Sequence, residues 1–304
     1  MNLRTFFTLF LVTTFAGCAT FAGLNYDQLF GEAQVRDRQV SLTTEHSDFF
    51  LGEVKPIIDN RCVVCHACYD APCQLKMSSV AGIDRGASKE LVHQGTRLTA
   101  ATPSRLFEDA QTTEQWRSMG FHSVLNERDQ TRTANIEAGL VAKMLMQKEV
   151  HPLPNQTQLE GFDFSIDRSQ VCPTIEEYDS YAQDHPTWGM PYGMPNLSSN
   201  EYSTLMSWLQ NGAIMNAPIP LTLEQQALVE EYEQFFNNGS RKAQLTARYI
   251  YEHLFLSHLY FSELNETTPR FFTLVRSETP PGQPVKRIAT RRPYDDPNLS
   301  LIHI

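Results

Sequence analysis

The chain lacks the long apolar runs of membrane-spanning proteins and the basic runs of nucleic-acid-binding proteins. After its first fifteen residues no apolar run approaches the length of a transmembrane helix, so any membrane contact is expected to be peripheral. There is no basic run, and a net charge of −10 with a pI near 5.4 argues against a nucleic acid partner. With 304 residues, 41% of them hydrophobic, the chain can bury the cores of two domains.

The N-terminus is typical of an export signal. A short basic start precedes an uncharged apolar stretch from Thr5 to Phe15, which is too short to span a bilayer. Residues 1–18 are therefore predicted to be a signal peptide. Cys18 follows an Ala-Gly pair and resembles the lipidated cysteine of bacterial lipoproteins; ordinary cleavage a few residues later is the alternative. Both alternatives place the mature chain in the periplasm, where thiols tend to oxidise.

The segment Cys62-Val63-Val64-Cys65-His66 constrains the chemistry most tightly. C-x-x-C-H is the attachment pattern of a c-type haem, in which the two thiols form thioethers and the histidine becomes the proximal iron ligand. A redox-active C-x-x-C pair is one alternative, and a zinc site that adds Cys68 and Cys73 is another. An exported, oxidising location argues against both, so the sequence predicts one covalent haem c.

The remaining cysteines leave the disulfide pairing open. If Cys18 takes lipid and the motif takes haem, three thiols remain, and three cannot all pair within one chain. Either Cys68 and Cys73 bridge a small loop, or Cys172 pairs with one of them.

A methionine-containing loop precedes a sharply defined helix. Ser198 and Glu201 form a capping box, Gly212 ends the helix, and an apolar stripe lies between them at Tyr202, Leu205, Met206 and Leu209. Loop and helix resemble the C-terminal third of a class I cytochrome c, in which methionine is the sixth iron ligand. Met190 is preferred over Met194, because its longer loop lets the thioether reach across the haem. A cavity should then separate His66 from Met190.

The predicted fold class is mainly α. Residues 25–217 are expected to form a class I cytochrome c-like haem domain with a long helical insertion at about 77–186, including helices over Ser88–Leu98 and Arg132–Val150. The scattered histidines of this region resemble solvated or core residues more than ligands: His93, His122, His151 and His185. Residues 218–304 are expected to begin a second, incomplete helical or α+β domain. Its aromatic-rich helix, from Ser240 to about Glu263, should be buried, with contact to lipid as the alternative.

The segment from Arg61 to Lys76 closely resembles the haem-binding segment of the bacterial fatty acid cis/trans isomerases. Ile288–Pro297 resembles another segment of that family, and the likeness runs from about Tyr26 to Pro297. Because family members are considerably longer, the chain is expected to be the N-terminal portion of a longer protein. Whether residues 299–304 are native stays open.

This resemblance implies an isomerase that converts cis double bonds to trans in the acyl chains of membrane phospholipids, a response to solvent or heat stress. It implies that Cys62, Cys65 and His66 bind haem c, that Met190 is the distal ligand, and that His66 acts in catalysis through the haem iron. A six-coordinate iron cannot bind the alkene directly, so either the methionine dissociates or electrons pass through the porphyrin edge. A periplasmic electron-carrier lipoprotein is the alternative function.

Overall fold

The computed structural model describes residues 25–36, 38–41, 45–67, 71–94, 97–98, 104–153, 162, 165, 170–267, 269–288, 290, 292–295 and 301–304. Within these residues the chain is largely helical, in line with the expected mainly α class. It divides into two compact units, Met1–Leu106 with Ala110–Ala217 and Phe107–Asp109 with Pro218–Ile304. No described helix combines the length and the apolar character that crossing a membrane requires.

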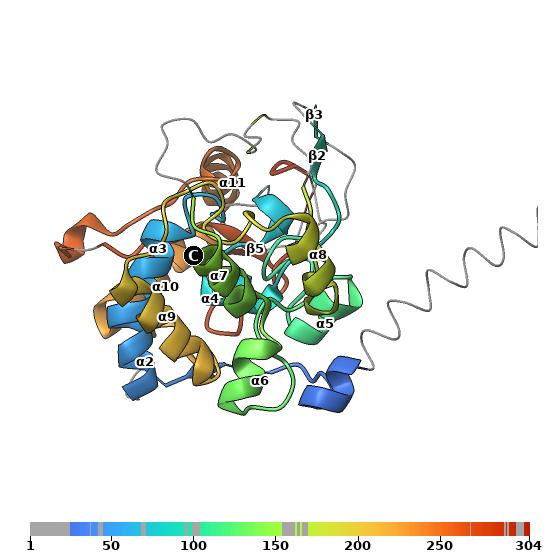
Figure 1. The fold of residues 1–304 in the computed structure, drawn as a ribbon. Helices are drawn as coiled ribbons and strands as arrows, with labels where there is room; N and C mark the ends of the chain where they lie inside the picture. The colour runs from blue at the N-terminus through green and yellow to red at the C-terminus, as the bar shows by residue number, and fades with distance from the viewer. Residues whose placement is uncertain are drawn as a thin grey trace, which may run out of the picture. The chain divides into compact units, whose positions relative to one another are not determined.

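The first unit contains most of the helices (Figure 1). After a helix over residues 25–30, its elements are β1 (Gln39–Val40), α2 (Glu45–Phe49), η1 (Phe50–Val54), α3 (Lys55–Arg61), η2 (Pro72–Gln74), α4 (Val80–Arg85), β2 (His93–Gln94), β3 (Arg97–Leu98), α5 (Thr113–Ser118), α6 (Arg132–Glu137), α7 (Leu140–Val150), η3 (Ile175–Glu177), α8 (Tyr178–Asp184), α9 (Ser199–Gln210) and β4 (Met215–Asn216). The second unit contains α10 (Leu223–Phe236), α11 (Arg241–Leu254), η4 (Ser262–Leu264), β5 (Val275–Ser277) and β6 (Leu301–His303).

The helical run from α2 through the π-helical segment η1 to α3 buries one apolar edge. Phe50, Val54 and Ile58 recur every four residues and are at most 2% exposed. The run packs against α9, where the ring centroids of Phe50 and Trp208 lie 5.8 Å apart. In Figure 1 this run and α9 lie side by side. Because the run ends at Arg61, this packing fixes where the C-x-x-C-H motif begins.

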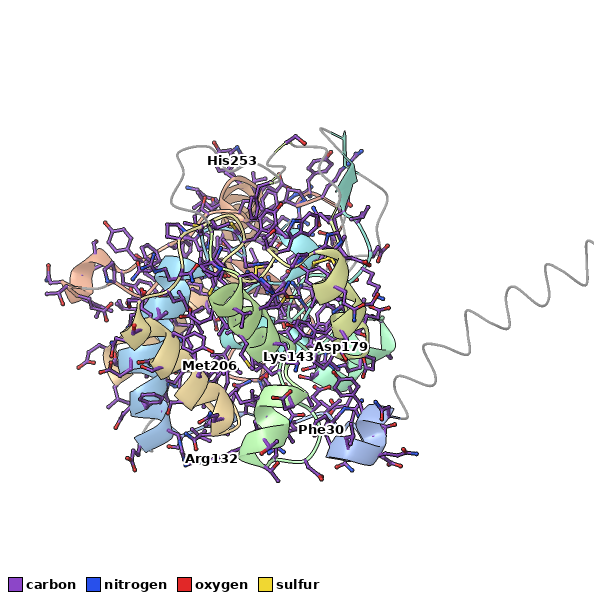
Figure 2. The ribbon with its side chains drawn as sticks, in the orientation of Figure 1. Phe30, Arg132, Lys143, Asp179, Met206 and His253 are labelled. Atoms are coloured by element: carbon purple, nitrogen blue, oxygen red, sulfur yellow. A yellow bond between two sulfur atoms is a disulfide. The ribbon has the colours of Figure 1, made fainter. Side chains whose placement is uncertain are left out.

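Helix α9 has the boundaries that its sequence predicts. The Ser198 hydroxyl accepts a hydrogen bond from the Glu201 N–H at 3.3 Å, and the Glu201 carboxylate accepts one from the Ser198 N–H at 2.8 Å, which confirms the capping box. The helix ends at Gln210, and Gly212 follows with a φ of +90°, a conformation that glycine adopts freely. Its apolar stripe faces the core through Leu205, Trp208 and Leu209, and Met206, labelled in Figure 2, is partly buried.

A bidentate ion pair joins the end of α3 to the start of α9. Arg61 Nε and Nη2 donate to the two carboxylate oxygens of Glu201 at 2.8 and 2.9 Å. These bonds, together with the Ser198 N–H, lower the pKa of Glu201 from 4.5 to about 2. Since the pKa is lowered in the folded state, the resulting stabilisation is present above pH 4.5 and is lost as the pH falls toward 2.

Glu201→Gln is expected to lower the free energy of unfolding by up to about 1 kcal/mol at pH 7, because glutamine keeps the capping box but removes the ion pair. The acid-induced loss of stability between about pH 5 and pH 2 should be smaller in this variant. Denaturant titrations at a series of pH values measure both effects, with the exposed Glu53→Gln as the control. An acid profile identical to that of the wild type would contradict the role of the pair.

The structure corrects the helix expected over Ser88–Leu98. In place of a helix, β2 and β3 pair antiparallel, and the backbone groups of Ala87 and His122 bond to each other at 3.0 and 2.8 Å. The extended conformation is caused by a contact with a segment that is distant in the sequence. Gly86 has a φ of +81°, and a Cβ there would lie 2.1 Å from the His122 carbonyl oxygen, so the chain leaves α4 in close, extended contact with His122.

The helix expected over Arg132–Val150 is divided into α6 and α7. The Val141 N–H donates to the Val124 carbonyl at 2.9 Å rather than continuing α6. Helix α7 also packs against α8, where the Tyr178 hydroxyl donates to the Lys143 carbonyl at 3.1 Å; Figure 2 labels Lys143 and Asp179 on these two helices. The apolar side chains of Ile136, Leu140, Met144 and Leu145 in this region are buried.

In the second unit, α10 begins at a capping box formed by Thr222 and Gln225, and α11 begins at the expected residue, Ser240. Helix α11 ends at Leu254 rather than near Glu263. The expected burial of its aromatic side chains is wrong in part. Tyr251 is buried, whereas Tyr249 is 62% exposed and Tyr260, beyond the end of the helix, is 56% exposed. The helix has one apolar face, not an apolar circumference.

The strands of the second unit bring the end of the chain against α10. Strand β6 pairs antiparallel with β5, and Val275 lies opposite His303. The buried His303 ring contacts the Thr279 carbonyl at 2.7 Å and the Glu233 carboxylate at 3.3 Å. Residues 301–304 are therefore packed into this unit.

Candidate functional site

The first unit contains a cavity of about 350 Å³. Its wall is built from α3 and the turn that follows, α7, residues 170–173, residues 188–197 and α9. Most of the lining side chains are apolar, among them Ile58, Val141, Met144, Leu145, Leu205 and Leu209. A concave apolar site with a few polar groups is the usual form of a site for a cofactor or small molecule.

The predicted haem residues Cys62, Cys65 and His66 all line this cavity. They form a tight turn after α3, in which the N–H groups of Cys65 and His66 donate to the Cys62 carbonyl at 3.1 and 2.9 Å. Both thiols are free. Burial, with smaller contributions from Cys65 and Asp59, raises the pKa of the Cys62 thiol to about 12, so this thiol is protonated at neutral pH.

The ring of His66 is buried and oriented by the backbone. Its Nδ1 lies 3.2 Å from the Leu75 carbonyl oxygen; a carbonyl can only accept, so Nδ1 carries the proton and Nε2 keeps its lone pair. Burial lowers the pKa of His66, with the bond to Leu75 acting in the opposite direction, and this favours the neutral ring. Metal-ligating histidines are usually held in this way, with the second nitrogen on a carbonyl or carboxylate.

Met190 and Met194 line the same cavity as His66. Their loop lies against α7. The Met190 N–H donates to the Met144 carbonyl at 3.0 Å. A Cβ at Gly189 would lie 2.4 Å from the backbone nitrogen of Lys148, so only glycine permits this close approach of the loop to α7. Since both methionines line the cavity, the choice of Met190 stays a prediction.

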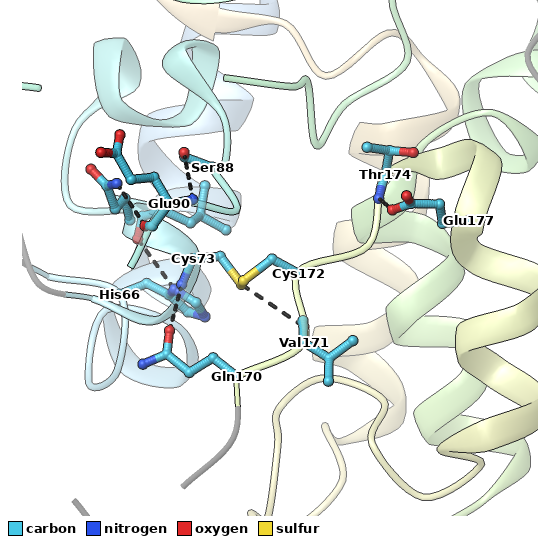
Figure 3. The surroundings of a disulfide bond; sticks show 11 residues. His66, Cys73, Ser88, Glu90, Gln170, Val171, Cys172, Thr174 and Glu177 are labelled. Carbon is cyan, nitrogen blue, oxygen red and sulfur yellow. Dashed lines mark hydrogen bonds between the residues drawn. A yellow bond between two sulfur atoms is a disulfide. The ribbon is translucent and has the colours of Figure 1, made fainter. Parts of the chain in front are cut away.

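A disulfide joins Cys73, in η2, to Cys172, with their Cα atoms 5.6 Å apart. Figure 3 shows this bond and the Cys73 N–H donating to the Gln170 side chain at 3.3 Å. Both cysteines line the cavity, so the bond ties residues 170–173 to the turn that follows the haem motif. The pairing left open by the sequence is thus Cys73 with Cys172, while Cys68 lies outside the described residues, as does Cys18.

This pairing removes Cys73 from the thiols that the zinc alternative requires. Within the described ranges, no group of three or more His, Cys, Asp or Glu side chains is placed to hold a metal ion. The cavity wall instead contains the free thiols of Cys62 and Cys65, the oriented imidazole of His66 and methionine thioethers, among them those of Met190 and Met194. Such soft sulfur and nitrogen donors suit haem attachment and iron ligation.

The sequence led us to expect His122 to be a solvated or core residue, and the structure places it on the wall of the cavity. Its Nε2 is buried and, among the described residues, has no hydrogen-bond partner. Nothing in the local sequence indicates this position, because His122 reaches the cavity through its backbone pairing with Ala87.

Lys148, on α7, is 2% exposed, and its Nζ has no hydrogen-bond partner among the described residues. Burial lowers its pKa, so the charged form is disfavoured in the folded state.

Lys148→Met is expected to raise the free energy of unfolding at pH 7 by about 1–3 kcal/mol, because it removes a buried unpaired ammonium. Since the pKa is lowered, wild-type stability should rise as the pH approaches 10.5, and the variant should lose this rise.

Urea titrations of Lys148→Met and the wild type at pH 7 and pH 10 measure this effect. Lys143→Met provides the matched control on the same helix, because Lys143 pairs with Glu137 at 2.7 Å. The control should not be stabilised. A Lys148→Met chain that is less stable than the wild type would contradict the unpaired state of this lysine.

A family model described as fatty acid cis/trans isomerase (CTI) matches residues 101–303. This chain belongs to the fatty acid cis/trans isomerase family. The match covers about two thirds of the chain, includes His122, Met190 and most of the second unit, and begins after the C-x-x-C-H motif. No curated protein and no solved structure matches the chain. The resemblance to this family is thereby confirmed, and the protein is an isomerase of fatty acyl chains.

Proposed function

We propose that this isomerase uses a covalent haem c, held by Cys62, Cys65 and His66, to convert cis double bonds to trans in the acyl chains of membrane phospholipids. The observation that carries the proposal is that all three residues lie on the wall of one apolar cavity, in a chain of the isomerase family. Two free thiols beside a neutral, oriented histidine are the donor set that a c-type haem requires.

The helices around the cavity support a cytochrome c-like fold for the first unit. The helical run that ends at Arg61 leads into the haem motif, and α9 follows the methionine loop. These two helices pack through Phe50 and Trp208 and are joined by the Arg61–Glu201 pair.

The chain's own residues prepare the site in three ways. The Leu75 carbonyl fixes the tautomer of His66, so that Nε2 is available to ligate iron. Met190, or Met194, supplies a thioether from a second loop. The apolar side chains of Val141, Met144 and Leu145 exclude water from the cavity and suit both a porphyrin and an acyl chain.

When bound, the haem supplies an iron that can withdraw electron density from the π bond and return it, with no net oxidation. No soluble cofactor is then required. A carbon–carbon double bond carries no titratable group, so the cavity needs no residue that donates or removes a proton.

We place the reaction at a periplasmic membrane surface. The signal peptide at residues 1–18 and the lipid on Cys18 stay predictions, since these residues lie outside the described part of the chain. An acyl anchor would hold the cavity near its substrate and make membrane contact peripheral.

The direct test uses the purified full chain, carrying haem, with vesicles of a phospholipid whose acyl chains are cis-monounsaturated. The trans fraction, measured by gas chromatography of the fatty acid methyl esters, should rise with time and without an added soluble cofactor. The Cys62→Ala/Cys65→Ala variant, which cannot hold haem covalently, is the control. A haem-loaded chain that leaves the lipid unchanged but exchanges electrons with respiratory proteins would overturn the proposal and support the electron-carrier alternative.

A further inference from the structure

The outer face of α11 carries apolar side chains that the core of the second unit does not use. Ala247 and Tyr251 lie on the buried face of this helix. Leu245 and Tyr249, one turn apart on the opposite face, are 71% and 62% exposed. Single exposed apolar residues are ordinary, but two that are neighbours on one helix face form an apolar strip open to solvent.

More exposed apolar side chains follow the end of the helix. Leu256, two residues after α11, is 78% exposed. Tyr260 and Phe271 are 56% and 59% exposed, and their ring centroids lie 6.2 Å apart. The segment from α11 to Phe271 therefore presents leucine, tyrosine and phenylalanine side chains to the surroundings of the protein.

Positive charges flank the strip on α11. At about 100° per residue, Arg241, Lys242 and Arg248 all lie within about 60° of it around the helix axis. Arg248 pairs with Glu252 at 2.6 Å. Arg241 and Lys242 are exposed and pair with no carboxylate in the part of the chain that the structure describes. Three cations and one carboxylate leave two positive charges on this face, in a chain whose net charge is −10.

The neighbouring helix of the same unit has the opposite charge. Helix α10 contains no lysine or arginine, and Glu224, Glu230 and Glu231 are exposed on it. An anionic surface would repel α10 and attract the outer face of α11. The charge of the second unit is therefore arranged to direct one helix face toward an anionic partner.

The mixture of side chains on α11 fits an anionic lipid bilayer best. Leucine enters the boundary between headgroups and acyl chains, and tyrosine keeps its hydroxyl at the level of the headgroups. Lysine and arginine reach the phosphates while their methylene groups stay on apolar surface. A protein partner fits less well, because the buried centre of a protein interface is depleted in lysine.

We propose that the outer face of α11 binds the chain to a bilayer that contains anionic phospholipids, with Leu245 and Tyr249 at the boundary between headgroups and acyl chains. The inference rests on the proposed function, because a phospholipid substrate requires the protein to reach the bilayer. It gives the second unit a task of its own, membrane binding, whereas the haem residues lie in the first unit.

The depth of α11 can be measured with the haem-loaded full chain and Leu245→Trp. Emission of the introduced indole should be quenched when the acyl chains of anionic phosphatidylglycerol vesicles are brominated. Leu223→Trp is the matched control, because Leu223 is 83% exposed at the start of the acidic helix α10, and its emission should not change. The wild type supplies the background of the three native tryptophans, which all belong to the first unit.

The charges are tested by sedimentation with the same vesicles. Each basic side chain near an anionic membrane strengthens binding about fivefold, so Arg241→Gln/Lys242→Gln should lower the partition coefficient about thirtyfold. Lys89→Gln/Arg132→Gln removes two exposed cations of the first unit and changes the net charge equally. This control should keep the wild-type partition coefficient.

An indole at position 245 that is insensitive to bromination, or wild-type partition of Arg241→Gln/Lys242→Gln, would overturn the inference and assign the exposed face of α11 to a protein contact. Neither measurement requires turnover, so these results would leave the haem proposal intact. A chain that binds vesicles through α11 but leaves the acyl chains unchanged would overturn the proposed function and support the membrane-binding face.

Discussion

His66→Ala is expected to reduce isomerase activity to the level of vesicles without protein. The substitution removes the imidazole whose Nδ1 bonds the Leu75 carbonyl and whose Nε2 is available for iron. It leaves the two thiols and the apolar wall unchanged, so the loss reports on the ligand and not on the cavity. The trans fraction of the acyl chains and the visible spectrum of the purified protein measure the result together.

The matched control for this variant is His151→Ala, because His151 is exposed at the end of α7 and does not line the cavity. It should retain wild-type activity and a wild-type spectrum. Full isomerase activity in His66→Ala would contradict the role of His66 and, with it, the participation of the haem iron in the reaction.

Removal of the disulfide should produce the largest change in stability. Cys73 and Cys172 are separated by 99 positions, and the bond restricts the unfolded chain over this whole length. Cys73→Ser/Cys172→Ser is expected to lower the free energy of unfolding of the first unit by about 2–5 kcal/mol. Tryptophan fluorescence in urea is a suitable measurement, because the three tryptophans, Trp116, Trp188 and Trp208, all belong to this unit.

A reducing agent provides the control for the disulfide prediction. It should lower the stability of the wild type to that of the double variant and leave the double variant unchanged. A wild type that is insensitive to reduction, or a double variant of wild-type stability, would contradict the contribution of this bond.

The features that the sequence predicts well are those with short-range causes. The capping box of Ser198 and Glu201 and the stripe that follows it specify α9 without help from the rest of the chain. The same holds for the start of α10 at Thr222. The spacing of the C-x-x-C-H motif also places its thiols and imidazole on one short turn, which is where the structure has them.

The features that the sequence does not predict depend on distant partners. Ser88–Leu98 has a helical pattern, but the contact between Gly86 and His122 draws the chain into an extended conformation. The choice of Cys172 as the partner of Cys73 depends on the path of the long insertion. The ring of His122 reaches the cavity through the same contact, so its position has no local signal.

Peptide mass spectrometry is the most direct test for a porphyrin attached to Cys62 and Cys65. The full chain would be produced with a functional haem c maturation system, digested with a protease and mapped. The peptide containing both cysteines should carry the mass of one haem. The same peptide with two unmodified thiols would contradict it.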